Sequence, residues 1–161
     1  IHPRIQKDFY KYTPRMECYR TAYETSRHSL CYNGDIFSHG DFQKLCSDFP
    51  DTKKVMLGRG ILQNPWLIGM LRSTDPAGSE SSVPAPDKEL LHAFCANLCG
   101  GYARVISGDK NVLFKLKALW IYLGTSFTNP QKYLKKIKKA NRLAEYEDAV
   151  DALFREQELI F

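Results

Sequence analysis

Residues 55–66, VMLGRGILQNPW, decide the fold class of this chain. An apolar run leads into Gly-Arg-Gly (58–60), and the Asn-Pro pair after it is typical of a helix start. Asn64 can cap such a helix, and Pro65 at its first position loses no hydrogen bond by lacking an amide proton. Glycines on both sides of an arginine at the end of a buried strand indicate that something approaches the backbone there.

A similar unit lies upstream of this stretch. A helical pattern at 14–28 is followed by SLCYNGD (29–35), a short apolar run that ends in Asn-Gly. The next segment, 38–50, places four apolar side chains on one helical face: Phe42, Leu45, Cys46 and Phe49. One helix between two short strands predicts a right-handed βαβ crossover with parallel strands, and therefore an α/β fold.

Glycine-containing loops follow both predicted strands, as Asn-Gly-Asp (33–35) and Gly-Arg-Gly (58–60). The carboxyl ends of parallel strands share one edge, and in eight-stranded barrels the last two loops there frequently hold a phosphate. Arg59 suits this ligand because its guanidinium pairs with a phosphate in a bidentate manner. His2 and Arg4 join the set if the first residue ends an earlier strand. Asn-Gly alone more often marks only a tight turn, but the second glycine pair favours a site for a phosphate-bearing cofactor.

The second half of the chain has a different composition. Residues 73–86 are rich in Ser, Pro, Gly and Ala, which predicts a linker. Four helical patterns follow, at 87–107, about 110–123, about 130–140 with Asn129 as its cap, and about 144–157. The first of them has an apolar stripe of Leu90, Leu91, Phe94, Cys95, Leu98, Tyr102, Val105 and Ile106. We therefore expect three parts: an αβ domain over 1–72, a linker over 73–86 and a small all-helical bundle over 87–161.

Charge and cysteine content restrict the function classes. The net charge is +5, and residues 109–142 are strongly basic whereas 145–158 are acidic. A basic face suits a polyanion, although a merely solvated lysine-rich face explains the pattern about equally well. The five cysteines form no Cys-x-x-Cys pair, which argues against a disulfide framework or a zinc site and favours a reducing, cytoplasmic compartment. No apolar run approaches the roughly 18 residues of a membrane span.

Three motifs together resemble the tRNA-dihydrouridine synthase family. They are IHPR (1–4), YNGDI (32–36) and VMLGRGILQNPW (55–66), in this order and at this spacing. The resemblance is good over residues 1–72. From residue 87 onward the chain matches the family's carboxyl-terminal helical domain in position and helix content, with weaker motifs.

The resemblance implies the carboxyl-terminal part of a (β/α)8 TIM barrel that binds FMN at its carboxyl mouth, followed by a helical tRNA-binding domain. It implies an oxidoreductase in which NADPH reduces FMN and a hydride then passes to C6 of a tRNA uridine. The implied cofactor-binding residues are His2, Arg4, Asn33, Gly34, Asp35, Gly58 and Arg59. The expected partner is tRNA, without a membrane, and the lysines expected to contact its backbone are Lys115, Lys117, Lys132, Lys135, Lys136 and Lys139.

The sequence departs from the family pattern in two places. The family's general acid is a cysteine in the amino-terminal half of the barrel; Cys31 does not match its motif, so no catalytic cysteine is assigned. The chain starts without Met, and we expect it to be part of a longer enzyme. In the helical region FKLKALWIYLG (114–124) retains Lys117, Trp120 and Tyr122 but lacks the family's Arg and His.

Two alternatives stay open on the sequence. The first is another FMN-dependent barrel oxidoreductase that acts on a small molecule, as dihydroorotate dehydrogenases and old yellow enzymes do. The linker and the basic helical region argue against it. The second is a non-catalytic RNA-binding remnant, which intact Asn-Gly-Asp and Gly-Arg-Gly loops argue against.

Overall fold

The computed structural model describes residues 1–8, 10–72 and 85–160. The chain divides into two compact units, which are described separately: unit 1 comprises Ile1–Ile61 and Pro65–Val83, and unit 2 comprises Leu62–Asn64 and Pro84–Phe161. The predicted linker 73–86 lies outside the described residues except for its last two positions. The domain boundaries drawn around it stay a prediction.

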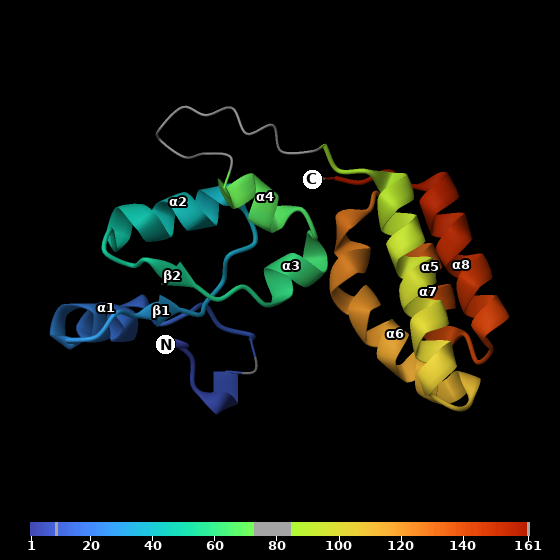
Figure 1. Cartoon of the computed structure of the whole chain (residues 1–161), viewed down its shortest axis with the longest axis horizontal. Helices are drawn as coiled ribbons and strands as arrows, with labels where there is room; N and C mark the ends of the chain where they lie inside the picture. The colour runs from blue at the N-terminus through green and yellow to red at the C-terminus, as the bar shows by residue number, and fades with distance from the viewer. Residues whose placement is uncertain (9, 73–84, 161) are drawn as a thin grey trace. The chain divides into compact units, whose positions relative to one another are not determined.

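Unit 1 contains the predicted strand–helix–strand crossover (Figure 1). Strand β1 (Cys31–Tyr32) and strand β2 (Lys54–Val55) are parallel, with Cys31 opposite Lys54. Between them lies helix α2 (His39–Asp48). Two further elements of unit 1 precede this crossover: the 3-10 helix η1 (Gln6–Asp8) and helix α1 (Met16–Thr25). Helix α1 matches the helix predicted at 14–28. The parallel crossover is therefore confirmed.

The first residue of the chain lies beside β1. The backbone nitrogen of Ile1 donates to the carbonyl of Cys31, 2.5 Å away, and its carbonyl accepts from the amide of Asn33 at 2.8 Å. One residue bonded to positions j and j+2 of its neighbour is the pairing pattern of parallel strands. Ile1 therefore continues the parallel pairing of β1 and β2. His2, Asn33 and Gly58 follow these three segments and lie at the edge formed by their carboxyl ends.

The core of unit 1 is built around aromatic rings from α1, β1 and the end of α2. Tyr19 and Phe49 are almost fully buried, and their rings meet edge to face with centroids 5.0 Å apart. Tyr32 packs against Tyr19 in the same way, at 4.9 Å. The Ser38 hydroxyl accepts from the amide of Asp41 and the Asp41 carboxylate from that of Ser38, a capping box that fixes the start of α2.

The helix prediction around the Asn-Pro pair was only partly right. A short helix, α3 (Arg59–Gln63), begins immediately after Gly58, where we expected a loop. Helix α4 (Leu67–Arg72) starts two residues after Pro65 and not at it. The Asn-Pro pair therefore separates two short helices instead of opening one.

Unit 2 contains the four helices that the periodicity predicts. They are α5 (Lys88–Val105), α6 (Asp109–Leu123), α7 (Gln131–Lys139) and α8 (Leu143–Glu156), with a 3-10 turn, η2 (Gly124–Ser126), after α6. The Asp87 side chain caps α5 by accepting from the amide of Leu90 at 2.9 Å. The buried side chains come from all four helices and include Leu91, Leu113, Leu116, Ile137 and Leu153.

Two local predictions in unit 2 were wrong. The buried face of α5 is Leu91, Cys95 and Cys99, whereas Leu90, Phe94 and Val105 are exposed, so the predicted stripe was too wide. Asn129 does not cap α7: the cap position is Pro130, and Asn129 adopts a left-handed φ of 43°. Asn tolerates this conformation better than most residues, which accounts for its presence in the turn.

The described residues contain two named strands, so they do not themselves show the eight-stranded barrel that the resemblance implies. What they do show is a parallel strand pair with its helix crossover, and a set of helices in unit 2. The α/β character of unit 1 and the helical character of unit 2 match the prediction to that extent.

Candidate functional site

The carboxylate of Asp35 is the centre of a charged cluster at the strand ends. Arg4 donates to it with both terminal nitrogens, Nη1 to Oδ1 at 2.9 Å and Nη2 to Oδ2 at 2.5 Å. Arg59 donates from Nη2 to Oδ1 at 2.6 Å. Positions 4, 35 and 59 are far apart in sequence, but each follows one of the three parallel segments, so the parallel arrangement brings them together as predicted.

Arg4 is a buried support within this cluster. Its side chain is 3% exposed, and its third nitrogen, Nε, donates to the carbonyl of Tyr12 at 2.9 Å. The hydrogen bond to Asp35 raises the pKa of Arg4 above its already high ordinary value, so the guanidinium is charged at every working pH. Because each of the three guanidinium nitrogens already donates to Asp35 or Tyr12, we expect Arg4 to act by orienting Asp35.

Arg59 is more accessible and is held between aromatic rings. Its side chain is 24% exposed, and its guanidinium carbon lies 4.0 Å from the centroid of the Tyr10 ring and 5.4 Å from that of Phe37. These contacts and the Asp35 bond fix the guanidinium by stacking and by charge. An arginine that is fixed in this way and still 24% exposed is suited to bind an anion without reorganisation.

Sequence reasoning missed Tyr10 and Phe37. Nothing in their spacing distinguishes them from other aromatic residues. The one structural signal is the backbone of Tyr10, whose φ of 61° is uncommon for a bulky residue and marks a locally strained loop. Its ring lies within reach of three of the predicted site residues: His2, Arg4 and Arg59.

His2 and Asn33 meet at the edge of the cluster. Nδ1 of His2 lies 2.5 Å from the carbonyl oxygen of Asn33. A carbonyl only accepts hydrogen bonds, so Nδ1 is the donor in this contact. The bond orients the imidazole toward the strand ends.

The glycines of the two loops differ in the space that is free beside their backbone. A side chain at Gly34 would collide with the ring of Tyr32, and one at Gly60 would collide with the carbonyl of Ile36. Both are required by packing inside unit 1. Gly58, in contrast, has no atom within 4 Å of the position of a Cβ, so the space beside its backbone is open to a ligand.

The predicted RNA-contacting lysines all lie in unit 2 but not in equivalent surroundings. Lys115 on α6 and Lys135, Lys136 and Lys139 on α7 are exposed. Lys132 lies 3.8 Å from Glu156, an exposed pair that holds it weakly. Lys117 is half-buried, and its ammonium donates to the carbonyl of Ala140 at 2.6 Å. It ties α6 to the end of α7, whereas the exposed lysines have their ammonium groups in contact with solvent.

A model of the dihydrouridine synthase family matches residues 1–158, nearly the whole chain. The chain belongs to the dihydrouridine synthase family. This confirms the resemblance drawn from the three motifs. Members of the family are oxidoreductases that form dihydrouridine in tRNA. A search of curated proteins finds no match to this chain.

Among the described residues of this dihydrouridine synthase chain, the two cysteines of α5 offer no reactive thiol. Burial raises the pKa of the Cys95 thiol to about 12 and is the main cause that raises that of Cys99 to about 11. Thiols with such pKa values stay protonated and unreactive. Over the same residues no group of His, Cys, Asp and Glu has the arrangement of a metal site. Among the described helices, none combines the length and the apolar character needed to cross a membrane.

Proposed function

We propose that this chain is the FMN-binding carboxyl-terminal part of a (β/α)8 barrel, joined to a helical RNA-binding domain, of an NADPH-dependent tRNA-dihydrouridine synthase. The observation that carries the proposal is the family match, because it extends over both units. We propose the cytoplasm as its location, since that is where its proposed substrate is processed.

The residues at the strand ends fit the phosphate end of FMN. Arg59 supplies a partly exposed guanidinium with a fixed orientation, and the open space beside Gly58 lets a ligand approach the backbone. Arg4 and Asp35 hold Arg59 in place, and Asn33, Gly34 and His2 border the same edge. The cluster carries a net positive charge from two arginines and one carboxylate, which matches an anionic ligand.

FMN, when bound, supplies the hydride chemistry, which protein side chains lack. The residues of this chain bind and orient: Arg59 neutralises negative charge, and His2, with Nδ1 held on Asn33, presents its other ring nitrogen at the same edge. The general acid of the reaction is proposed to come from the family's amino-terminal half. A base can be reduced only after it has left the base stack of the RNA. The rest of the RNA must therefore be held outside the mouth of the barrel. In our proposal the exposed lysines of unit 2 hold its backbone.

The proposal is tested by titrating the full chain into FMN and following flavin fluorescence, and by measuring tRNA binding in parallel. We expect both ligands to bind and Arg59→Met to weaken FMN binding about tenfold or more, because it removes a charge-assisted contact. Arg27→Met, at an exposed position outside the cluster, is the matched control.

The two alternatives predict different results. FMN binding without tRNA binding would favour a barrel oxidoreductase that acts on a small molecule. tRNA binding without FMN binding would favour an RNA-binding remnant. Native mass spectrometry of the purified protein detects bound flavin directly. Dihydrouridine in tRNA incubated with NADPH and the flavin-loaded protein, measured by nucleoside mass spectrometry, reports the activity.

A further inference from the structure

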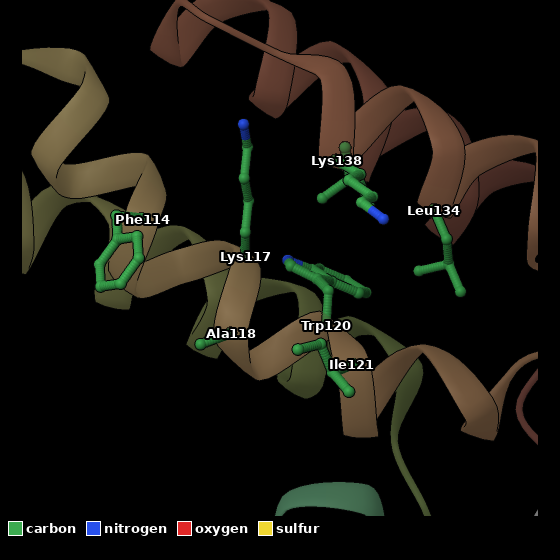
Figure 2. A pocket seen from close by; sticks show the side chains of 8 residues that line it. Phe114, Lys117, Ala118, Trp120, Ile121, Leu134 and Lys138 are labelled. Carbon is green, nitrogen blue, oxygen red and sulfur yellow. The ribbon is translucent and has the colours of Figure 1, made fainter.

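An apolar groove of about 580 Å³ lies between α6 and α7 within unit 2 (Figure 2). Its lining residues are Phe114, Lys117, Ala118, Trp120, Ile121, Leu134, Ile137 and Lys138. Figure 2 shows Lys117 extending from α6 toward α7, with the ring of Trp120 between the two helices. The groove is separate from the strand-end cluster of unit 1, and the packing of the core does not explain why it is open.

The α6 side of the groove exposes large apolar side chains. Phe114 is 75% exposed and Ile121 is 69% exposed. They are seven residues apart, so they lie on one face of the helix about two turns from each other. Large apolar side chains gathered at the surface around a hollow mark a binding surface more often than isolated ones do.

The floor of the groove is rigid. Trp120 is only 3% exposed, and its indole Nε1 donates to the buried hydroxyl of Tyr146 at 2.8 Å. Lys117 is fixed by its bond to the carbonyl of Ala140. A ligand in the groove therefore meets a preformed apolar surface, which lowers the entropic cost of binding.

The charged groups that line the groove are all positive. Lys117 and Lys138 are its charged lining residues, and none of the lining residues is acidic. Lys135, exposed on α7, precedes Lys138 by three positions and therefore lies on the same helical face. Apolar and aromatic groups edged by lysines complement a ligand that is flat and apolar in one part and anionic in another.

We propose that this groove binds one unpaired nucleotide of RNA, with its base packed against Phe114 and Ile121 and its phosphate next to Lys138. This inference rests on the proposed RNA-binding function and extends it. Lysine ammonium groups are the only side-chain hydrogen-bond donors among the lining residues apart from the Trp120 indole, which Tyr146 already occupies. The groove therefore holds a base by its face and tolerates any base identity. A base inside a duplex presents no free face, so the groove discriminates single-stranded from double-stranded RNA.

The test compares fluorescence anisotropy titrations of the full chain with labelled octauridine and with an RNA duplex. We expect Phe114→Ala to weaken octauridine binding about tenfold, because base–aromatic stacking contributes on this scale, and to leave duplex binding unchanged. Since Phe114 is largely exposed, the substitution is not expected to affect folding. Phe94→Ala, on α5 and 49% exposed, is the matched control and should change neither affinity.

A third variant separates this inference from the function on which it rests. Lys139→Ala removes an exposed charge outside the groove and should weaken both RNAs alike. If Lys139→Ala weakens binding but Phe114→Ala does not, or if Phe114→Ala weakens both RNAs equally, the nucleotide groove is refuted while RNA binding stands. If neither RNA binds, both proposals fail. Self-association that Phe114→Ala abolishes, with RNA binding unchanged, would assign the groove to a second copy and overturn the inference.

Discussion

The two units use positive charge in opposite ways. In unit 1, two arginines converge on the carboxylate of Asp35, and one of them, Arg4, is 3% exposed. In unit 2, lysines are distributed over the exposed faces of α6 and α7, and the buried interior is almost entirely apolar. Converging charge builds a preorganised site for one anion, whereas distributed charge suits a long polyanion with many weak contacts. A count of basic residues does not distinguish these two designs.

This comparison predicts that the two units lose stability through different kinds of substitution. The chain has two tryptophans, Trp66 in unit 1 and Trp120 in unit 2. Labelling with 5-fluorotryptophan therefore gives one fluorine NMR signal for each unit, and urea unfolding can be followed for both in one sample. All stability predictions below use this measurement.

The largest effect is expected from the apolar core of unit 2. Leu116→Ala should lower the free energy of unfolding reported by Trp120 by about 2–5 kcal/mol, because Leu116 is 1% exposed and its truncation leaves a cavity. Val105→Ala, 80% exposed on α5, should change it by less than about 0.5 kcal/mol. A loss of less than about 1 kcal/mol for Leu116→Ala would mean that the core is not the main source of stability in unit 2.

In unit 1 the charged cluster of Arg4, Asp35 and Arg59 should contribute measurably to the free energy of unfolding, although it consists of only three side chains. Asp35→Asn keeps the shape of the side chain but leaves the buried guanidinium of Arg4 without its counter-ion, and we expect a loss of about 1.5–3 kcal/mol in the Trp66 signal. Asp51→Asn is the control, since its side chain is 84% exposed and lies 4.0 Å from Lys53. Equal effects of the two substitutions would contradict a supporting role for the cluster.

The two glycines around Arg59 should respond differently to the same substitution. Gly60→Ala places a methyl group against the carbonyl of Ile36 and should cost about 1–3 kcal/mol in the Trp66 signal. Gly58→Ala meets no atom and should leave stability unchanged or raise it by up to about 1 kcal/mol. If FMN binds beside Gly58 as proposed, Gly58→Ala should weaken FMN binding even though it does not lower stability. The reverse order of the two stabilities would show that α3 does not pack on Ile36 as described.

The smallest effect is a pH dependence in unit 2. A hydrogen bond from the hydroxyl of Tyr133 is the main cause that lowers the pKa of Glu156 from its ordinary value of 4.5, and Lys132 adds to it. A carboxyl whose pKa is lower in the folded state stabilises the fold above pH 4.5 and ceases to do so as the pH falls through the folded value. We therefore expect the Trp120 signal to report decreasing stability below pH 4.5.

Glu156→Gln is the variant that checks this dependence. It should make the decrease shallower without removing it, because the pKa of Glu145 is also lowered, chiefly by the amide of Asn141. An unchanged pH profile in Glu156→Gln would show that its carboxylate contributes nothing to the acid sensitivity of unit 2.

The sequence alone determined the longer helices, the parallel strand pair and the family. Hydrophobic periodicity gave α5 to α8 because each of these helices must bury one face, and the two apolar runs around one helix gave the parallel pair β1 and β2. The order and spacing of Asn-Gly-Asp and Gly-Arg-Gly pointed to the family, and the family match over residues 1–158 confirmed it. Asn129 and the Asn-Pro pair were misjudged because the same residues favour caps and turns, and only the surrounding chain selects between them.

Only the tertiary structure decided what each residue of the site does. Arg4 and Arg59 both donate to Asp35, but Arg4 is 3% exposed and also bonded to Tyr12, whereas Arg59 is 24% exposed and lies beside Tyr10 and Phe37. Gly58 and Gly60 differ only in what lies beside them, and the groove at Phe114 exists only because α7 packs against α6. Burial and contact depend on segments that are distant in sequence, and for that reason no local pattern encodes them.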